Sequence, residues 1–242
     1  NHPDDAIKAN HTLSFQLPKL AFMFPGNYLN VGEWEILPIG LNADFINKQE
    51  SDYYLIDEAL VQENIICRDK FSHKGSYGHV LLVAGSYGKM GAAILGAHAC
   101  LRTGAGLLTV HIPKIAYQIM QTALPEAMIS IDWSEVIISN VADVDKYTAI
   151  GVGPGIGTKN NTQKALEDLF DKTNCPMVID ADALNILAEK KELLTKIPKH
   201  SILTPHPKEF ERLVGKTKGD YERMQIQKEF AQKHHLYVVL KG

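Results

Sequence analysis

The cluster at residues 204–209, which reads TPHPKE, contains the residue types best suited to chemistry in this chain. Pro205 and Pro207 flank His206 and restrict the backbone on both sides of it. Glu209 falls on the first turn of the helix that is expected to follow. A histidine and a carboxylate so placed could contact a phosphorylated ligand and its metal ion. The same pattern is typical of a helix N-cap with an acidic first turn, so both interpretations stay open.

A pair of carboxylates, Asp180 and Asp182, follows an apolar run at residues 176–179 that predicts a buried strand. Carboxylates two residues apart at a strand end could hold a metal ion or act as a base. Asp182 directly precedes a predicted helix at residues 183–189, which favours a role as its N-cap. Asp180 is equally consistent with a structural and a functional role.

A glycine-rich loop ends the apolar run that begins at residue 147, and residues 150–158 read IGVGPGIGT. Its glycines could leave backbone N–H groups free to face an anion near the start of a predicted helix at residues 160–170. The dinucleotide fingerprint G-x-G-x-x-G is not met, because Thr158 stands where the last glycine should be. A tight loop without a ligand is the alternative.

A second glycine-rich loop, GSYGKMG at residues 85–91, fails the Walker pattern because Met90 stands where Ser or Thr is required. Lys89 is therefore not a P-loop lysine by its motif. Contact with a phosphate and exposure to solvent are equally consistent with its position.

The scaffold for these clusters is predicted from the alternation of strands and helices that begins at His79. Each predicted strand is a continuous apolar run, which indicates a doubly wound, mostly parallel α/β sheet with helices on both faces. Because right-handed crossovers bring the strand-to-helix loops to one edge, we expect the clusters to meet at the carboxyl edge of the sheet. Strands are expected at residues 80–84, 107–112, 127–131, 147–152, 176–179, 201–204 and 237–240.

The first 42 residues follow a different pattern. Leu13, Phe15 and Leu17 alternate with polar residues, as in a half-buried strand, and residues 33–37 predict a second strand. Because two strands cannot form a stable domain alone, we expect a short β remnant that packs on another structure. Residues 43–69 are predicted to be a linker that contains a short helix at residues 56–63.

Composition narrows the class of protein. The 242 residues are 45% hydrophobic with a net charge of −3, which predicts one sizeable core and gives no basic field for nucleic acid. Cys67, Cys100 and Cys175 lack metal-ligand or disulfide spacing, so we expect a reducing, cytoplasmic setting. No apolar run approaches the about 18 residues of a membrane span. The start has no signal-peptide character and no initiator Met, so both ends are expected to be truncated.

Six segments resemble, in family order, the dehydratase domain of the NAD(P)H-hydrate repair enzymes, which are members of the ribokinase-like superfamily. They read HKGSYGHVLLVAGS, GAAILGAHACLRTGAGLLTV, GVGPGIG, VIDADALNIL, LTPHPKEFERLVG and VVLKG. The resemblance covers residues 70–242 and implies a ribokinase-like fold that lacks its C-terminal part. Residues 1–42 in turn resemble the end of the epimerase domain that precedes the dehydratase in bifunctional members.

The resemblance implies a reaction in nicotinamide nucleotide repair. The S-form of NAD(P)H hydrate (NADHX or NADPHX) is dehydrated to NAD(P)H at the expense of ADP or ATP, with release of AMP or ADP and phosphate. Mg²⁺ is implied as the cofactor. The parent protein is expected to interconvert the R and S hydrates as well, with K⁺ as a candidate ion in the epimerase part.

The resemblance also implies roles for individual residues. Ala92, Gly155 and His206 match positions that contact the hydrated dinucleotide. Lys241 and Gly242 match the start of the run that holds ADP or ATP.

Three further roles follow from the same resemblance. Glu209 matches the acid that orients Mg²⁺ through water, and Asp180 is expected to support the site. The catalytic aspartate of the family belongs to a GxGD segment that is expected beyond Gly242, so residues 1–242 by themselves are expected to be inactive. Related enzymes and the small-residue helices suggest a homo-oligomer.

Two other functions stay open at this point. One is a different ribokinase-like kinase for a small molecule, such as a hydroxymethylpyrimidine-type kinase. The other is a binding fragment without catalysis. The context of His206 and the GPGIG loop favour the dehydratase.

Overall fold

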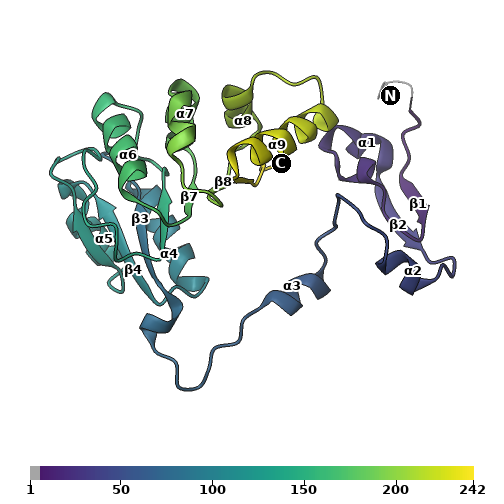
Figure 1. Cartoon of the computed structure of the whole chain (residues 1–242), viewed down its shortest axis with the longest axis horizontal. Helices are drawn as coiled ribbons and strands as arrows, with labels where there is room; N and C mark the ends of the chain where they lie inside the picture. Colours follow the sequence, from purple (N-terminus) through teal and green to yellow (C-terminus); the bar gives the residue numbers. More distant parts are fainter. Residues whose placement is uncertain (1–5) are drawn as a thin grey trace. The chain divides into compact units, whose positions relative to one another are not determined.

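The computed structural model describes residues 6–242, whose helices and strands are drawn in Figure 1. It divides into two units. The larger one comprises Phe71–Lys216 and Gln225–Gly242, and the smaller one comprises the chain up to Lys70 together with Thr217–Met224. The beginning of the segment predicted at residues 1–42 lies outside the described residues. In the part of the chain that the structure describes, every helix is too short or too polar to cross a lipid bilayer.

The larger unit is built around a seven-stranded sheet in which all neighbouring strands run parallel. The strand order is β5-β4-β3-β6-β7-β8-β9. The prediction of a parallel α/β sheet is therefore confirmed. The strands are β3 (His79–Val83), β4 (Leu107–Ile112), β5 (Met128–Ile131), β6 (Ala149–Val152), β7 (Met177–Ile179), β8 (Ile202–Leu203) and β9 (Tyr237–Val238).

Hydrophobic side chains are buried on both faces of this sheet. Successive side chains of a strand point to opposite faces. Accordingly, Leu81 and Val83 of β3 belong to one buried cluster, whereas Leu82 and Ala84 belong to another. The first cluster includes residues of α6, α7, α8 and α9, and the second includes residues of α4 and α5. These helices are α4 (Met90–Arg102), α5 (Tyr117–Ala123), α6 (Asn160–Lys172), α7 (Asp182–Glu189), α8 (Pro207–Val214) and α9 (Asp220–His234).

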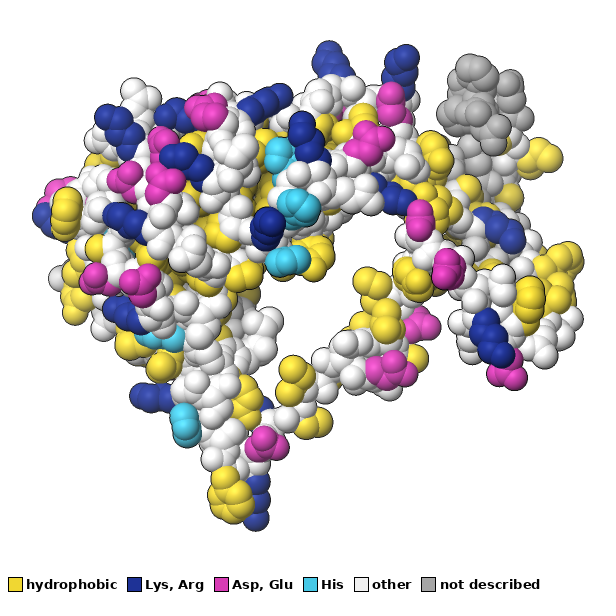
Figure 2. All heavy atoms as spheres, viewed as in Figure 1, with side chains coloured by type: hydrophobic (Ala, Val, Ile, Leu, Met, Phe, Trp, Pro, Cys, Tyr) yellow, Lys and Arg dark blue, Asp and Glu magenta, His cyan; other side chains and the backbone are white. Residues whose placement is uncertain are grey.

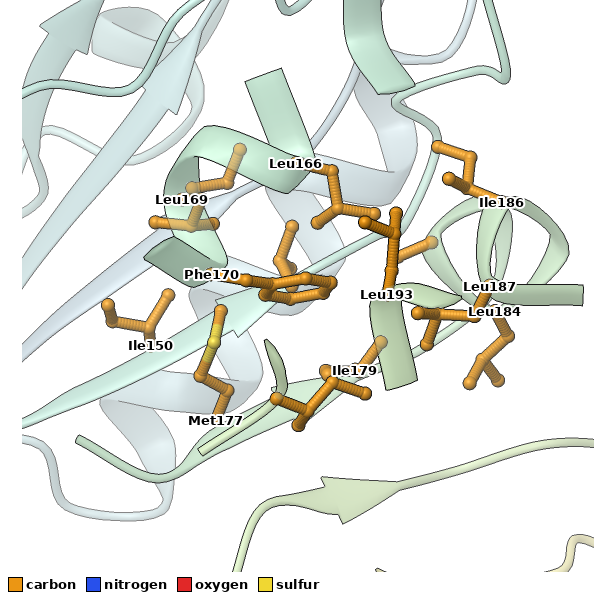
Figure 3. Packing of buried hydrophobic residues seen from close by; sticks show 14 of the residues in the cluster. Ile150, Leu166, Leu169, Phe170, Met177, Ile179, Leu184, Ile186, Leu187 and Leu193 are labelled. Atoms are coloured by element: carbon orange, nitrogen blue, oxygen red, sulfur yellow. The ribbon is translucent and has the colours of Figure 1, made fainter. Parts of the chain in front are cut away.

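Figure 3 shows part of the first cluster, in which side chains of α6 and α7 meet those of the central strands. Leu169 and Phe170 of α6 and Met177 and Ile179 of β7 are at most 3% exposed. Complete burial of side chains of this size stabilises a fold by about 1.5–3 kcal/mol each. The cluster therefore fixes the strands from which the loops at the carboxyl edge extend.

The direction in which strands are added reverses at β3. The chain first adds β4 and β5 on one side of β3 and then crosses over to place β6 on the other side. In open α/β sheets, ligands bind outside the carboxyl ends of the strands at such a switch point. The loops that follow β3 and β6 border this point, so both predicted glycine-rich loops lie where a ligand is expected.

The smaller unit contains the two strands predicted near its start. They are β1 (His11–Phe15) and β2 (Glu33–Leu37), and they pair parallel. The apolar side of β1 is not the covered side within this chain. Leu13 and Phe15 are 62% and 64% exposed, whereas Ser14 is buried.

The covered face of this small sheet is explained by a tertiary contact. Trp34 lies opposite Thr12 in the register, on the same face as Ser14. The Trp34 ring packs against the ring of Phe22, with centroids 5.8 Å apart. The segment between the strands therefore covers the face that alternation in β1 alone marks as polar.

The rest of the smaller unit consists of short helices and extended chain. The helix predicted at residues 56–63 is confirmed as α3, where the Asp57 side chain accepts a hydrogen bond from the Leu60 N–H. Hydrophobic side chains lie on the surface of this unit in Figure 2, and Phe45, Tyr54 and Ile66 are among the exposed ones. The helices are α1 (Tyr28–Val31), α2 (Ala43–Asn47) and α3 (Glu58–Asn64).

Residues near the start of α9 complete the smaller unit. The Gly26 N–H donates to the Asp220 carboxylate at 2.8 Å, and the Phe24 ring meets the Tyr221 ring edge-on. These contacts explain why Thr217–Met224 groups with the N-terminal segment.

Candidate functional site

The glycine-rich loop after β6 lies directly against the loop after β3. The Gly85 N–H donates to the Pro154 carbonyl at 2.8 Å, and the Ser86 hydroxyl donates to the Gly155 carbonyl at 2.7 Å. These bonds join the two loops across the switch point of the sheet. The two predicted glycine-rich loops therefore form one structure.

Most N–H groups of this loop are used inside the protein. The N–H groups of Gly153, Ile156 and Gly157 donate hydrogen bonds of 3.2, 3.3 and 2.8 Å. The Gly155 N–H has no hydrogen-bond partner among the residues that the structure describes. The loop is therefore a wall in which most N–H groups are already used, rather than the cradle of several free N–H groups that its composition suggests.

Gly155 and Ala92 are brought together by this packing. Gly155 has a φ of +70°, and a Cβ atom there would lie 3.1 Å from the Cβ of Ala92 and 3.0 Å from the carbonyl oxygen of Lys89. Lys89 immediately precedes α4, and Ala92 lies in its first turn. Two of the three residues predicted to contact a dinucleotide are thus in mutual contact at the switch point.

The prediction that Asp182 caps α7 is wrong. Helix α7 begins at Asp182 itself, and the preceding residue is Ala181, which makes no side-chain capping bond. An N-cap residue must lie before the helix, whereas Asp182 is already its first residue. Its carboxylate instead accepts a hydrogen bond from the Gly157 N–H at 2.8 Å and pairs with the Lys89 ammonium at 3.1 Å.

Asp180 and Lys241 form an ion pair at the ends of β7 and β9. The Lys241 Nζ lies 2.8 Å from the Asp180 Oδ1, with the side chains 46% and 31% exposed. The Lys241 N–H donates to the Pro205 carbonyl at 2.9 Å and so continues the pairing of β9 with β8. The structure therefore places Lys241 and Gly242 beside the segment that carries His206.

His206 is the N-cap of α8, which is one of the two roles that its sequence context left open. Its Nδ1 atom accepts hydrogen bonds from the N–H groups of Lys208 and Glu209 at 3.1 and 3.2 Å. The Glu209 carboxylate accepts a hydrogen bond from the His206 N–H at 2.9 Å, which completes a capping box. Because Nδ1 accepts, the neutral ring carries its proton on Nε2. The side chain is 45% exposed, so the cap does not bury the ring.

Glu209 does not fit direct ligation of a metal ion. The residue is 7% exposed, one carboxylate oxygen accepts from the His206 N–H, and the other lies 3.4 Å from the His206 Nε2. Among the described residues, no group of three or more His, Cys, Asp or Glu side chains could hold a metal. A metal ion at this edge would therefore take most of its ligands from a bound phosphate and from water.

A buried cluster around Asp132, at the end of β5, was not predicted from the sequence. The Asp132 carboxylate lies 3.1 Å from the His111 Nε2 and accepts hydrogen bonds from the Ser139 hydroxyl and the Ser134 N–H. Burial by itself would raise the pKa of Asp132. The hydrogen bonds from His111, Ser139 and Ser134 outweigh it and hold the pKa of this carboxyl well below its usual range.

The segment that Asp132 anchors also reaches the candidate site. The Val136 carbonyl accepts a hydrogen bond of 2.9 Å from the Tyr87 N–H, in the loop after β3. The Ile138 carbonyl accepts one of 2.9 Å from the Thr162 hydroxyl, in the first turn of α6. A histidine inside the apolar run of β4 is the sequence signal that could have indicated a buried polar partner.

A parallel sheet of this order, with a glycine-lined site at its switch point, belongs to the ribokinase-like class of α/β proteins. A ribokinase-like superfamily protein of Enterococcus faecalis has a TM-score of 0.67 at 27% identity, over 80% of this chain and 69% of that one. An ADP/ATP-dependent NAD(P)H-hydrate dehydratase of Bacillus subtilis, co-crystallised with ATP and Mg²⁺, has a TM-score of 0.63 at 33% identity. That match covers 77% of this chain and 65% of the other.

The sequence model for NAD(P)H-hydrate dehydratase matches residues 80–242, and the chain belongs to this family. An ADP-dependent (S)-NAD(P)H-hydrate dehydratase of Streptococcus thermophilus is 41% identical over 66% of this chain and 57% of its own length. A bifunctional NAD(P)H-hydrate repair enzyme of Moorella thermoacetica is 33% identical over 98% of this chain and 46% of its own length. The chain thus spans about half the length of the bifunctional relatives that it matches.

Proposed function

We propose that the chain serves nicotinamide nucleotide repair through ADP- or ATP-dependent dehydration of the S-form of NAD(P)H hydrate to NAD(P)H. Membership of the dehydratase family supports this activity. The observation that carries the proposal is the contact of Gly155 with Ala92 at the switch point of the sheet. Two residues without long side chains leave the backbone accessible there, as the close approach of a dinucleotide requires.

The proposed reaction proceeds in two balanced steps. The ring hydroxyl of the hydrate attacks the terminal phosphate of ADP and gives up its proton to solvent, so that a phosphate ester forms and AMP leaves. The bond from the ring carbon to the ester oxygen then breaks, the neighbouring carbon loses a proton, the double bond re-forms, and phosphate is released. Because hydroxide is a poor leaving group and phosphate a good one, the nucleotide makes the elimination possible. The protein contributes positioning and stabilisation of charge.

We assign the two ligands to adjacent parts of the carboxyl edge. Ala92, Gly155 and His206 face the hydrated dinucleotide, and the exposed His206 ring offers its Nε2 proton as a hydrogen-bond donor. Lys241 and Gly242 begin the nucleotide side. The ion pair of Lys241 with Asp180 supports this assignment, since it holds an ammonium group at the end of β9.

Mg²⁺ is the ion that we propose to accompany the nucleotide, and it would neutralise charge on the phosphates. Glu209 is assigned to an indirect role through a water molecule, since both of its carboxylate oxygens lie near His206. The base that removes the ring proton is not assigned to a residue of this chain.

The test of the proposed function is an assay on the full-length protein with hydrated NADH. With ADP or ATP present, we expect the absorbance of reduced nicotinamide to return, with one AMP or ADP and one phosphate released per NADH formed. The assay without nucleotide is the control. No recovery with either nucleotide would overturn the proposal, and phosphorylation of a vitamin precursor instead would indicate a different ribokinase-like kinase.

Two variants of His206 separate its helix cap from its contact with substrate. His206→Ala removes the cap and is expected to lower the free energy of unfolding by about 1 kcal/mol. His206→Asn keeps a capping acceptor, so its stability should stay within roughly 0.5 kcal/mol of the native protein. Both variants lack the imidazole and should raise the KM for the hydrate roughly tenfold. The KM for the hydrate and the thermal unfolding of each variant are measured together. If both variants keep the native KM, His206 acts only as a helix cap.

For the rest of the chain, we propose three domains. Residues 1–42 are the end of an epimerase domain, residues 43–69 are a linker, and residues 70–242 are the dehydratase domain. The match of bifunctional relatives over 98% of the chain supports this division. Conversion of the R hydrate to the S hydrate by the full-length protein, and its dependence on K⁺, would test the epimerase part.

We further propose a cytoplasmic homo-oligomer. The exposed Leu95 on α4, among small residues, is consistent with a covered surface in an assembly. Light scattering of the full-length protein would measure the oligomeric state, and a monomer at micromolar concentration would contradict it.

A further inference from the structure

Two carboxylates after β7 contact different parts of the carboxyl edge, namely Asp180, which follows the strand directly, and Asp182, which is the first residue of α7. Asp180 pairs with Lys241 at the end of β9. Asp182 contacts Gly157 and Lys89, which belong to the loops after β6 and β3. Residues 180–182 thus lie between the side that we assign to the dinucleotide and the side that we assign to the nucleotide.

The backbone of Ala181 separates the two carboxylates. It has a φ of 52° and a ψ of −119°, a conformation that residues other than glycine rarely adopt and that costs about 1–3 kcal/mol. Hydrogen bonds on both sides hold it. The Asp180 N–H donates to the Val152 carbonyl at 3.0 Å, and the Asn185 N–H donates to the Ala181 carbonyl at 3.1 Å. The turn is therefore fixed by β6 and by the first turn of α7.

Asp182 joins the two loops that form the dinucleotide side. Its carboxylate receives the Gly157 N–H at 2.8 Å, and the Lys89 ammonium lies 3.1 Å from the same oxygen. The carbonyl oxygen of Lys89 lies against Gly155, close to Ala92. Loss of the carboxylate would release the glycine loop from the start of α4, where Gly155 and Ala92 meet.

Asp180 contacts Lys241, on the side that we assign to the nucleotide. Its carboxylate is 2.8 Å from the Lys241 Nζ, and the Lys241 backbone is paired with Pro205. Loss of this carboxylate would free the lysine side chain while the backbone pairing of β9 with β8 remains.

We propose that residues 180–182 are a two-sided positioning element, in which Asp182 sets the wall against the hydrated dinucleotide and Asp180 orients Lys241 toward the nucleotide. Both carboxylates act through other residues. The assignment of the dinucleotide and the nucleotide to the two sides rests on the proposed function. The positioning of the glycine loop by Asp182 and of Lys241 by Asp180 does not.

Steady-state kinetics of the full-length protein with hydrated NADH and ADP test the assignment. Asp182→Ala is expected to raise the KM for the hydrate about tenfold and to change the KM for ADP by less than about twofold. Asp180→Ala is expected to raise the KM for ADP about tenfold and to change the KM for the hydrate by less than about twofold. Asp182→Asn keeps an oxygen acceptor for the Gly157 N–H and should recover most of the loss. Asp168→Ala, at an exposed position of α6, is the matched control and should leave both constants unchanged.

Hydrogen–deuterium exchange without ligands gives a second readout that needs no activity. Asp182→Ala should increase exchange in peptides that contain Gly157, because the Gly157 N–H loses its acceptor. Asp180→Ala should leave exchange there unchanged, and it should also leave exchange around Lys241 unchanged, because the Lys241 N–H keeps its bond to Pro205. Equal effects of both variants on both sides, or native exchange and KM values in both, would overturn the positioning element. If the native protein is inactive but exchange around Gly157 rises in Asp182→Ala alone, the proposed function is overturned and the positioning role of Asp182 is retained.

Discussion

Gly153→Ala is expected to lower the free energy of unfolding by roughly 2–5 kcal/mol. The backbone φ at this position is unfavourable for alanine, and neighbouring atoms already fill the place of its Cβ atom. Gly153 has a φ of +129°, and its Cβ atom would lie 1.8 Å from the Asp180 carbonyl oxygen and 2.9 Å from the Ala183 Cβ. The first of these atoms belongs to a backbone that is itself hydrogen-bonded to β6. The denaturant midpoint and Tm of the full-length protein measure the loss.

Gly157→Ala is the matched control for this prediction. Gly157 also has a positive φ, of +77°, but nothing lies within 4 Å of the position of its Cβ atom. Only the conformational cost applies, so the loss should be about 1–2 kcal/mol. Equal losses in the two variants would show that the approach of Asp180 is not what requires glycine at position 153.

Asp132→Ala is the second substitution with a large expected effect, a loss of about 3–5 kcal/mol in the free energy of unfolding. The carboxylate is 1% exposed and accepts hydrogen bonds from His111, Ser139 and Ser134. Its removal leaves buried donors without an acceptor, which costs more than the pair contributes when intact. Asp145→Ala, at an exposed position, is the control and should change stability by less than about 0.5 kcal/mol.

The same carboxylate predicts how stability depends on pH. The pKa of Asp132 is lowered in the folded state, so the unfolded chain binds the proton more readily. Its contribution is complete above the unfolded pKa of about 4 and is lost progressively as the pH falls toward the lower pKa of the folded state. Unfolding free energies measured from neutral pH to about pH 2 should therefore fall more steeply in the native protein than in Asp132→Asn. If stability falls equally with pH in the two proteins, the lowered pKa of Asp132 is contradicted.

Most strands of the larger unit could be predicted from the sequence because they are largely apolar runs, as strands buried on both faces require. The meeting of Gly155 with Ala92 could also be anticipated in outline. Parallel topology alone brings the loops after β3 and β6 to one edge. The distance between the two residues depends on how those loops fold and required the structure.

Other features depend on contacts that local patterns do not contain. Asp182 was expected to be a cap because it precedes a helical pattern, but the helix begins one residue earlier and its carboxylate serves a distant loop. The pairing of Asp180 with Lys241 joins residues 61 apart, so no local pattern contains it. Alternation in β1 indicated two unlike faces but could not show which one the following segment covers.

The arrangement of β1 and β2 has a practical consequence for handling the protein. Each of these strands has a single partner among the described residues, and Leu13 and Phe15 are exposed on the open face of the pair. Unpaired strand edges beside exposed hydrophobic side chains template association with other chains. Wherever no other segment covers this pair, it is the part of the chain from which aggregation during expression and storage is expected to start.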